Sequence, residues 1–198
     1  MKPLEGLTIL DLSRVLACPF ATMILAELGA RVIKVEQPGS GDETRRFEPQ
    51  LARDSAYYFV CNRTKESITV NLRADEGRKL VRELAQKADV LVENLRPGRM
   101  KRFGLDYDTL AKANPGLIYM SVNAFGNSGP DHNQPGFDPL LQARSGVMAA
   151  QGGPHHHPVY LTCAICDYGA AMLSAFGCIL ALRSRQKTGL GQFLSVQG

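Results

Sequence analysis

The residues best placed to do chemistry are Asp167 and the two thiols before it, Cys163 and Cys166. A β-prone run at 159–162 precedes them and a helix-prone run continues to about residue 185, so Asp167 falls where a helix is expected to begin. An acid there can cap the helix, because its oxygens accept the first unpaired backbone N–H groups. These donors and the helix dipole also keep a carboxylate ionised and able to attack an electrophile. Asp167 is therefore expected to act as a cap, as a nucleophile or as both.

Two alternatives use the neighbouring residues. Cys163 and Cys166 have the spacing of a thioredoxin-like redox motif, but too little chain follows for the rest of that fold, so we interpret them as structural thiols. His155, His156 and His157 suggest zinc, yet alternate side chains of an extended chain diverge and a second ligand pair is missing. We predict a polar loop there and no metal site.

A basic cluster follows the strand expected at 89–93 and comprises Arg96, Arg99, Lys101 and Arg102. Ligands of open α/β sheets bind beyond the carboxyl ends of strands, and arginine suits phosphate recognition. A solvated basic turn would have the same composition. Charge alone leaves both interpretations open.

Composition excludes several classes of protein. The 198 residues are 44% hydrophobic and 21% charged, and the net charge of +4 is scattered, which disfavours a nucleic-acid surface. No uninterrupted apolar run is long enough to span a bilayer, and the N-terminus lacks a signal-peptide pattern. Five cysteines without a small secreted scaffold indicate free thiols and a cytoplasmic location.

The first elements define the fold class. A strand at 7–12, a helix at 19–28 and a strand at 31–36 form a β-α-β unit, which predicts an open, mostly parallel, Rossmann-like α/β sheet with helices on both faces. The further elements expected are a loop at 37–53, strands at 67–72, 89–93, 117–122 and from 193, and helices at 75–88, 107–113 and 139–149.

Two features qualify this fold. The turn at 13–19 lacks the glycines that a dinucleotide site requires, so NAD binding is not expected. The last strand stops at Gly198, which suggests that the chain is a piece of something longer.

Six segments follow one another along the chain: LEGLTILDLSRVLACPFATMILAELGARVIKVEQPGSGD, NRTKESITVNL, ADVLVENLRPGRMKRFGL, GFDPLLQARSG, CDYGAAM and KTGLGQ. In their order and spacing they resemble the family III CoA-transferases, the relatives of formyl-CoA:oxalate and carnitine CoA-transferases. Members are usually much longer. The resemblance implies that residues 1–198 are the N-terminal part of the large CoA-binding domain, without the small second domain and the C-terminal return.

The resemblance also implies a reaction. Coenzyme A would pass from an acyl-CoA thioester to a carboxylic acid acceptor through a covalent intermediate on Asp167. The CoA thioester would be a substrate, with no permanently bound cofactor, and the partner would be a second copy in an interlocked homodimer. The alternative that is not an enzyme is a CoA-binding fragment or subunit without activity of its own.

Family contacts to CoA map by motif onto nine positions: Val15, Leu16, Gln37, Leu72, Asn94, Leu95, Arg96, Arg102 and Phe103. Of these, the resemblance implies that Arg96 and Arg102 face phosphates. Leu16 and Gln37 replace the glutamine and arginine of formyl-CoA transferase, which weakens formyl-CoA or oxalate as the specific substrate.

Phe137 and Asp138 are expected near the substrate. The related 2-methylacyl-CoA racemases have a histidine where this chain has Phe137. Phenylalanine cannot exchange a proton, so Phe137 favours a transferase over the racemase alternative. Asp138 is expected to contact substrate, to help position the site, or to cap the helix that follows it.

Overall fold

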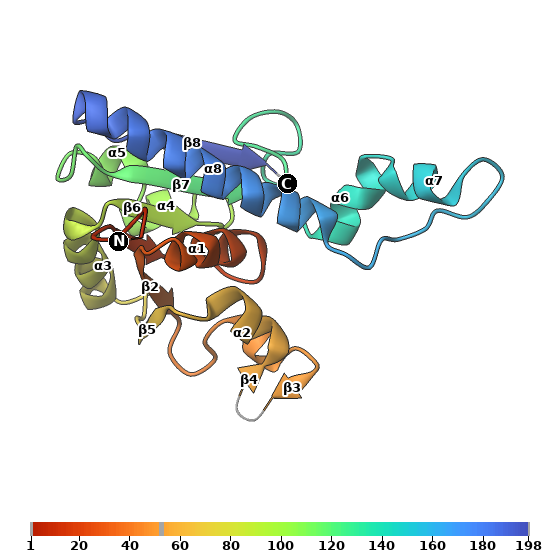
Figure 1. The fold of residues 1–198 in the computed structure, drawn as a ribbon, viewed down its shortest axis with the longest axis horizontal. Helices are drawn as coiled ribbons and strands as arrows, with labels where there is room; N and C mark the ends of the chain where they lie inside the picture. The colour runs from red at the N-terminus through yellow and green to blue at the C-terminus, as the bar shows by residue number, and fades with distance from the viewer. Residues whose placement is uncertain (1, 52–53, 198) are drawn as a thin grey trace.

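The computed structural model describes residues 2–51 and 54–197 and contains one six-stranded sheet (Figure 1). All five neighbouring strand pairs are parallel. The order across the sheet is β5 (Glu66–Thr69), β2 (Arg31–Glu36), β1 (Thr8–Asp11), β6 (Val90–Glu93), β7 (Ile118–Asn123) and β8 (Phe193–Gln197). The predicted fold class is thereby confirmed. The order reverses between β1 and β6, and crevices at such a switch point are where open α/β sheets bind ligands.

Helices cover both faces of the sheet. The helices α1 (Ala17–Glu27) and α8 (Ile165–Thr188) pack over one face, and α3 (Asp75–Lys87), α4 (Arg99–Phe103) and α5 (Tyr107–Leu110) over the other (Figure 1). Successive strand residues alternate between the two cores: Val92 and Met120 face α1 and α8, whereas Leu91 and Tyr119 face the opposite layer. Burial on both faces explains why the central strands β6 and β7 are nearly continuously apolar.

A small subdomain beside α1 has no counterpart among the predicted elements. It comprises the 3₁₀ turn η1 (Glu43–Arg46), the short strands β3 (Gln50–Leu51) and β4 (Asp54–Ser55), and the helix α2 (Ala56–Asn62). Ser55 caps α2 by accepting from the Tyr58 N–H at 3.0 Å, so a serine before an apolar run was the available signal. Arg53, in the expected loop, and the terminal Gly198 lie outside the described residues.

An arm projects from the sheet and carries α6 (Asp138–Arg144) and α7 (Val147–Gly152) (Figure 1). The prediction of one helix at 139–149 was wrong, because Gly146, with φ +83°, separates the two helices. The expected strand at 159–162 was also wrong. The Val159 N–H donates to the Met148 carbonyl at 2.9 Å, and no strand pairs with this segment within residues 2–51 and 54–197.

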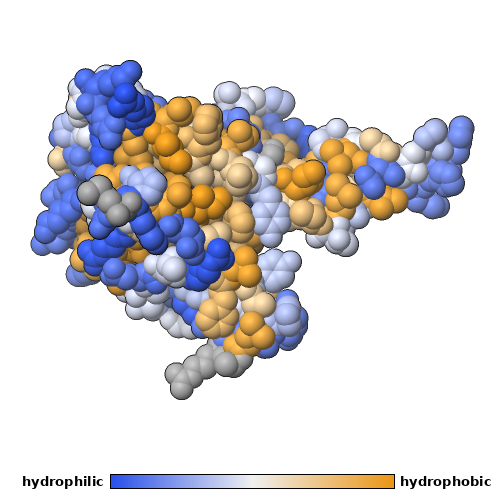
Figure 2. All heavy atoms as spheres, in the orientation of Figure 1, coloured by the Kyte–Doolittle hydropathy of each residue, from blue (hydrophilic) through white to orange (hydrophobic). Residues whose placement is uncertain are grey.

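Helix α8 is long and apolar enough to cross a membrane by length and composition, which the sequence pattern did not suggest. Core helices of soluble proteins pass the same test, so this is weak evidence of a membrane span. One side of α8 packs on α1 and the sheet through small residues such as Ala175 and Cys178. The other side leaves Met172, Leu173 and Phe176 each 60% exposed, and Figure 2 shows apolar residues gathered over α1 and α8 and along the arm.

Candidate active site

Asp167 lies inside the first turn of α8 and does not cap it. The N-cap residue is Ala164, whose side chain makes no capping hydrogen bond. Asp138, at the start of α6, accepts instead from the backbone N–H groups of Cys166 at 2.7 Å and Asp167 at 3.2 Å through Oδ2. The expected N-cap role of Asp167 was therefore wrong, because a residue remote in sequence satisfies the donors that it would have used.

A buried amide holds Asp138 in place. Gln142, one turn further along α6, donates to Asp138 Oδ1 and also pairs with the backbone of Leu161 through bonds of 3.0 and 3.1 Å. Asp138 is 3% exposed and Gln142 is fully buried. Asp138 is not the cap of its own helix, since the N-cap there is Phe137. Asp138 and Gln142 therefore fasten the arm to the start of α8.

The electrostatic environment of Asp167 differs from the one expected. Burial and, secondarily, the nearby Asp138 carboxylate raise the pKa of Asp167 from 3.8 to about 6. The helix N–H groups do not lower it, because Asp138 accepts from them. At neutral pH Asp167 is still mostly ionised, and a partly desolvated carboxylate is a better nucleophile than a fully hydrated one.

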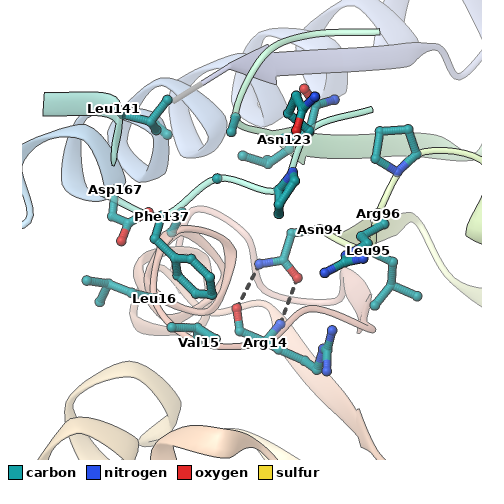
Figure 3. A pocket seen from close by; sticks show the side chains of 18 of the residues that line it. Arg14, Val15, Leu16, Asn94, Leu95, Arg96, Asn123, Phe137, Leu141 and Asp167 are labelled. Carbon is teal, nitrogen blue, oxygen red and sulfur yellow. Dashed lines mark hydrogen bonds between the residues drawn. The ribbon is translucent and has the colours of Figure 1, made fainter. Parts of the chain in front are cut away.

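Asp167 opens into a cavity of about 290 Å³ at the carboxyl ends of β1, β6 and β7, here called the Asp167 pocket (Figure 3). Phe137, 65% exposed, also lines it. Figure 3 shows Asp167 and Phe137 near Leu16 and Val15 at one end and Arg96 toward the other. The predicted CoA contacts that line this pocket are Val15, Leu16, Asn94, Leu95 and Arg96.

A second pocket adjoins the first and is here called the Gln37 pocket. Three further predicted CoA contacts, Gln37, Leu72 and Phe103, line it, and Arg14 and Leu95 line both pockets. The remaining predicted contact, Arg102, lines neither. The two pockets share Arg14 and Leu95 and bring together residues that are far apart in sequence, and they are here together called the groove.

Three further arginines line this groove, and only one of them, Arg99, belongs to the predicted basic cluster. Arg73 and Arg99 contribute to the Gln37 pocket, and Arg14 lies between the two pockets. Guanidinium groups bind phosphates and carboxylates through paired hydrogen bonds, so the groove suits an anionic ligand. The position of Arg14 in the loop beyond the carboxyl end of β1 was the signal that could have identified it.

The loop between β1 and α1 contains an unusual backbone conformation. Val15 has φ +69°, a region that β-branched residues almost never adopt and that costs of order 1–3 kcal/mol. The preceding residue, Arg14, is fixed by Asn94, which accepts from the Arg14 N–H at 2.9 Å and donates to its carbonyl at 2.7 Å (Figure 3). Asn94 therefore holds this loop as well as lining the pocket.

One wall of the Asp167 pocket depends on a close approach of two loops. A Cβ added to Gly136 would lie 2.1 Å from the Cβ of Ala124, and both residues line the pocket. Any side chain at Gly136 would force Ala124 or the backbone next to Phe137 to shift, which would change this wall of the pocket.

The cysteines and histidines do not join this site. Cys163 is exposed and Cys166 is half-buried, and neither residue follows a strand. The two thiols are therefore not the close-packed pair that the structural interpretation had expected. His155, His156 and His157 are exposed near the tip of the arm. Within the described ranges no group of three or more His, Cys, Asp or Glu side chains could hold a metal ion.

A family model for CoA-transferase family III matches residues 4–197. The chain belongs to this family. Among curated proteins, the acetyl-CoA:oxalate CoA-transferase of Acetobacter aceti is 44% identical over 195 residues, covering 98% of this chain and 50% of that protein. The succinyl-CoA:glutarate CoA-transferase of Mus musculus is 46% identical over 196 residues, covering 98% of this chain and 45% of that protein.

Solved structures agree with this family assignment. A CaiB/BaiF family protein from Brucella suis superposes with a TM-score of 0.94 at 40% identity, covering 99% of this chain and 53% of that chain. A Mycobacterium tuberculosis protein, Rv3272, superposes with a TM-score of 0.93 at 34% identity, covering all of this chain and 55% of that one. The chain therefore spans about half the length of the family III relatives that it matches.

Proposed function

We propose that the natural polypeptide carrying this chain transfers coenzyme A from an acyl-CoA thioester to a carboxylic acid, with Asp167 as the nucleophile. One observation carries the proposal: a partly buried carboxylate lies in a pocket that continues into an arginine-lined second pocket. This arrangement supports a ligand with a reactive end at Asp167 and an anionic remainder in the groove. Membership of family III supports the same chemistry.

The proposed reaction passes through two kinds of intermediate on Asp167. The carboxylate attacks the thioester carbon and expels the CoA thiolate, which leaves an aspartyl mixed anhydride. The thiolate then attacks the aspartyl carbon and releases the donor acid, which leaves an aspartyl-CoA thioester. The acceptor carboxylate attacks this thioester to form a second anhydride, and the thiolate attacks its acyl carbon, forming the new acyl-CoA and restoring Asp167. Each step exchanges one leaving group and needs no cofactor.

CoA would lie along the groove. Val15, Leu16, Asn94, Leu95 and Arg96 would contact the thioester end, and Gln37, Leu72 and Phe103 the nucleotide end. The same proposal assigns residues 1–198 to the large CoA-binding domain. Arg14, Arg73 and Arg99 have a stronger claim to phosphate contacts than Arg102, because they line the groove and Arg102 does not.

The acceptor is proposed to be a short dicarboxylic acid. The names of relatives pair CoA with oxalate, glutarate, malate or citramalate. In this chain Arg96 lines the pocket that holds Asp167, and its guanidinium would bind the second carboxylate while the first reacts.

The racemase alternative lacks support at the site. It requires a second base, and none of the residues lining the Asp167 pocket is a histidine. Phe137 occupies the position where the racemases have one. Absence of deuterium uptake at the α-carbon of a 2-methylacyl-CoA, together with CoA exchange, would separate the two reactions.

Trapping the intermediate tests the proposal. The protein is incubated with a series of acyl-CoA thioesters and quenched with hydroxylamine or borohydride, and the peptide containing Asp167 is analysed by mass spectrometry. A hydroxamate or a reduced side chain at Asp167 is expected. Turnover with an unmodified Asp167 would rule out the covalent route.

The rate should fall in acid as Asp167 becomes protonated. Its pKa is raised to about 6, so the nucleophilic carboxylate is lost as the pH falls through 6, not through the ordinary value near 4. We expect the single-turnover rate of acyl transfer to Asp167 to have an acid limb with an apparent pKa of about 6. A single-turnover rate that does not change between neutral pH and pH 4.5 would contradict this environment for Asp167.

Two further parts of the proposal concern assembly and location. A homodimer is supported by the exposed apolar side of α8, where Met172, Leu173, Phe176 and Leu180 have no partner within the described residues. Sedimentation velocity would detect it, and a monomer at micromolar concentration would argue against it.

A cytoplasmic location is supported by the five free cysteines.

A further inference from the structure

Two buried charged side chains bind the backbone of residues 13–15, which includes the strained Val15. The Lys34 ammonium, on β2, donates to the Ser13 carbonyl at 3.0 Å. Asp42, just before η1, accepts from the Val15 N–H at 3.3 Å. A strained residue persists only where its surroundings over-determine it, and such strain concentrates at functional sites. Val15 lines the Asp167 pocket, so its strained conformation determines part of the pocket wall.

Lys34 and Asp42 form an ion pair in the interior. Their charged atoms are 2.9 Å apart, and the side chains are 1% and 0% exposed. A second buried pair, Lys65 and Asp11 at 3.0 Å, lies beside them, so the cluster is neutral overall. Burial opposes the charge on Lys34, but Asp11 and Asp42 outweigh it and raise the pKa of Lys34.

Buried ion pairs are weak evidence for stability, because well-packed apolar residues often stabilise a core equally well. Their better attested use is to specify one arrangement among several. Here the arrangement specified is the backbone of residues 13–15, because one member of the pair binds Ser13 and the other binds Val15. This backbone leads directly into Leu16 and the start of α1, which also line the pocket.

We propose that the Lys34–Asp42 pair is a positioning device that keeps Val15 in its strained conformation, so that Val15 and Leu16 form a fixed wall for the acyl group beside Asp167. This inference deepens the proposed function and rests on it. Lys34 and Asp42 act through the loop backbone and are positioning residues, not catalytic ones.

Relief of the strain provides the test. Lys34→Met with Asp42→Ala removes the pair without leaving a lone charge, and Val15→Gly removes the strain, because glycine adopts positive φ freely. The pair variant should lower kcat/KM for the acyl-CoA by about tenfold to a hundredfold. Adding Val15→Gly to it should restore kcat/KM to within about threefold of Val15→Gly alone.

Arg31→Met is the matched control, because Arg31 lies on the same strand and pairs with Glu66 at the surface, with side chains 59% and 56% exposed. It should leave kcat and KM unchanged. If Lys34 and Asp42 merely stabilise the fold, Val15→Gly will not rescue the pair variant and the losses will add, which overturns the inference. Should the pair variant not fold, Lys34→Met with Asp42→Asn, which also leaves no lone charge, replaces it in the same comparison.

Failure of the proposed function is distinguishable from failure of this inference. If the unmodified protein transfers no CoA under any condition, the proposed function is wrong, and hydrogen exchange of the Arg14 amide, whose acceptor Asn94 is present in every variant, then decides the inference. Faster exchange in the pair variant that returns toward normal with Val15→Gly supports the positioning role. Unchanged exchange in all variants overturns it.

Discussion

Replacing Asp167 by alanine is expected to abolish CoA transfer, with a loss on the order of 10⁴-fold or more, as for other covalent nucleophiles. Among the described residues that line the Asp167 pocket, the other acid is Glu43, and Arg14 engages it at 2.9 Å. The adduct trapped by hydroxylamine should disappear at the same time. The measurement is CoA exchange between an acyl-CoA and a labelled acid.

Asp167→Asn should lose activity while gaining stability at neutral pH. The folded state raises the pKa of Asp167 to about 6, so it binds more protons than the unfolded state between about pH 4 and 6. Stability therefore falls as the pH rises through that window, and an amide avoids the loss. We expect a gain of about 1–2 kcal/mol at pH 7.5 after discounting for partial solvent screening, and almost none at pH 4.

Asp108→Ala is the matched control for these variants, because Asp108 is an exposed acid in the first turn of α5. It should retain full transfer activity. Appreciable exchange by Asp167→Ala, with Asp108→Ala normal, would show that the reaction does not depend on a carboxylate at this position.

The second large effect is expected at Asp138. Alanine there leaves the N–H groups of Cys166 and Asp167 without their acceptor and removes the link to Gln142. The first turn of α8 should loosen, and displacement of a nucleophile by about 1 Å can reduce the rate about 10²-fold. Unsatisfied buried donors should also lower stability by about 1–3 kcal/mol. Both kcat and thermal unfolding are measured.

Asp106→Ala separates the positioning role of Asp138 from ordinary capping. Asp106 caps α5 by accepting from the Thr109 N–H at 3.2 Å and lines neither pocket. Its loss should reduce stability by about 1 kcal/mol with no change in kcat per folded molecule. If Asp138→Ala behaves the same way, Asp138 is only a cap and the arm does not position Asp167.

Much of the fold follows from local patterns. Continuous apolar strands separated by helices predict a parallel sheet, and the five strands expected before residue 123 and the one starting at 193 all form, with ends that differ by a few residues. Gly29 and Gly189 end their helices with positive φ, as glycine allows. Such features depend on neighbours within a few positions, which the sequence displays directly.

The arm could not be predicted in the same way. The run at 159–162 has β-prone side chains, but a strand needs a neighbour to pair with, and in the part of the chain that the structure describes no strand pairs with it. Continuity of helix-prone residues across 139–149 concealed the break at Gly146. Both errors arise because propensity is local, whereas pairing and chain direction are set by the packed molecule.

The residue types needed at the site were visible in the sequence: an aspartate before a helix of small residues, asparagine and arginine after β6, and phenylalanine before Asp138. Only the tertiary structure decided how they are arranged. It placed Asp138 under the helix start that Asp167 was expected to cap, joined two pockets through Arg14 and Leu95, and buried Lys34 and Asp42 beneath a strained Val15. Those contacts join segments distant along the chain, and burial, hydrogen-bond geometry and pKa exist only once the chain has brought them together.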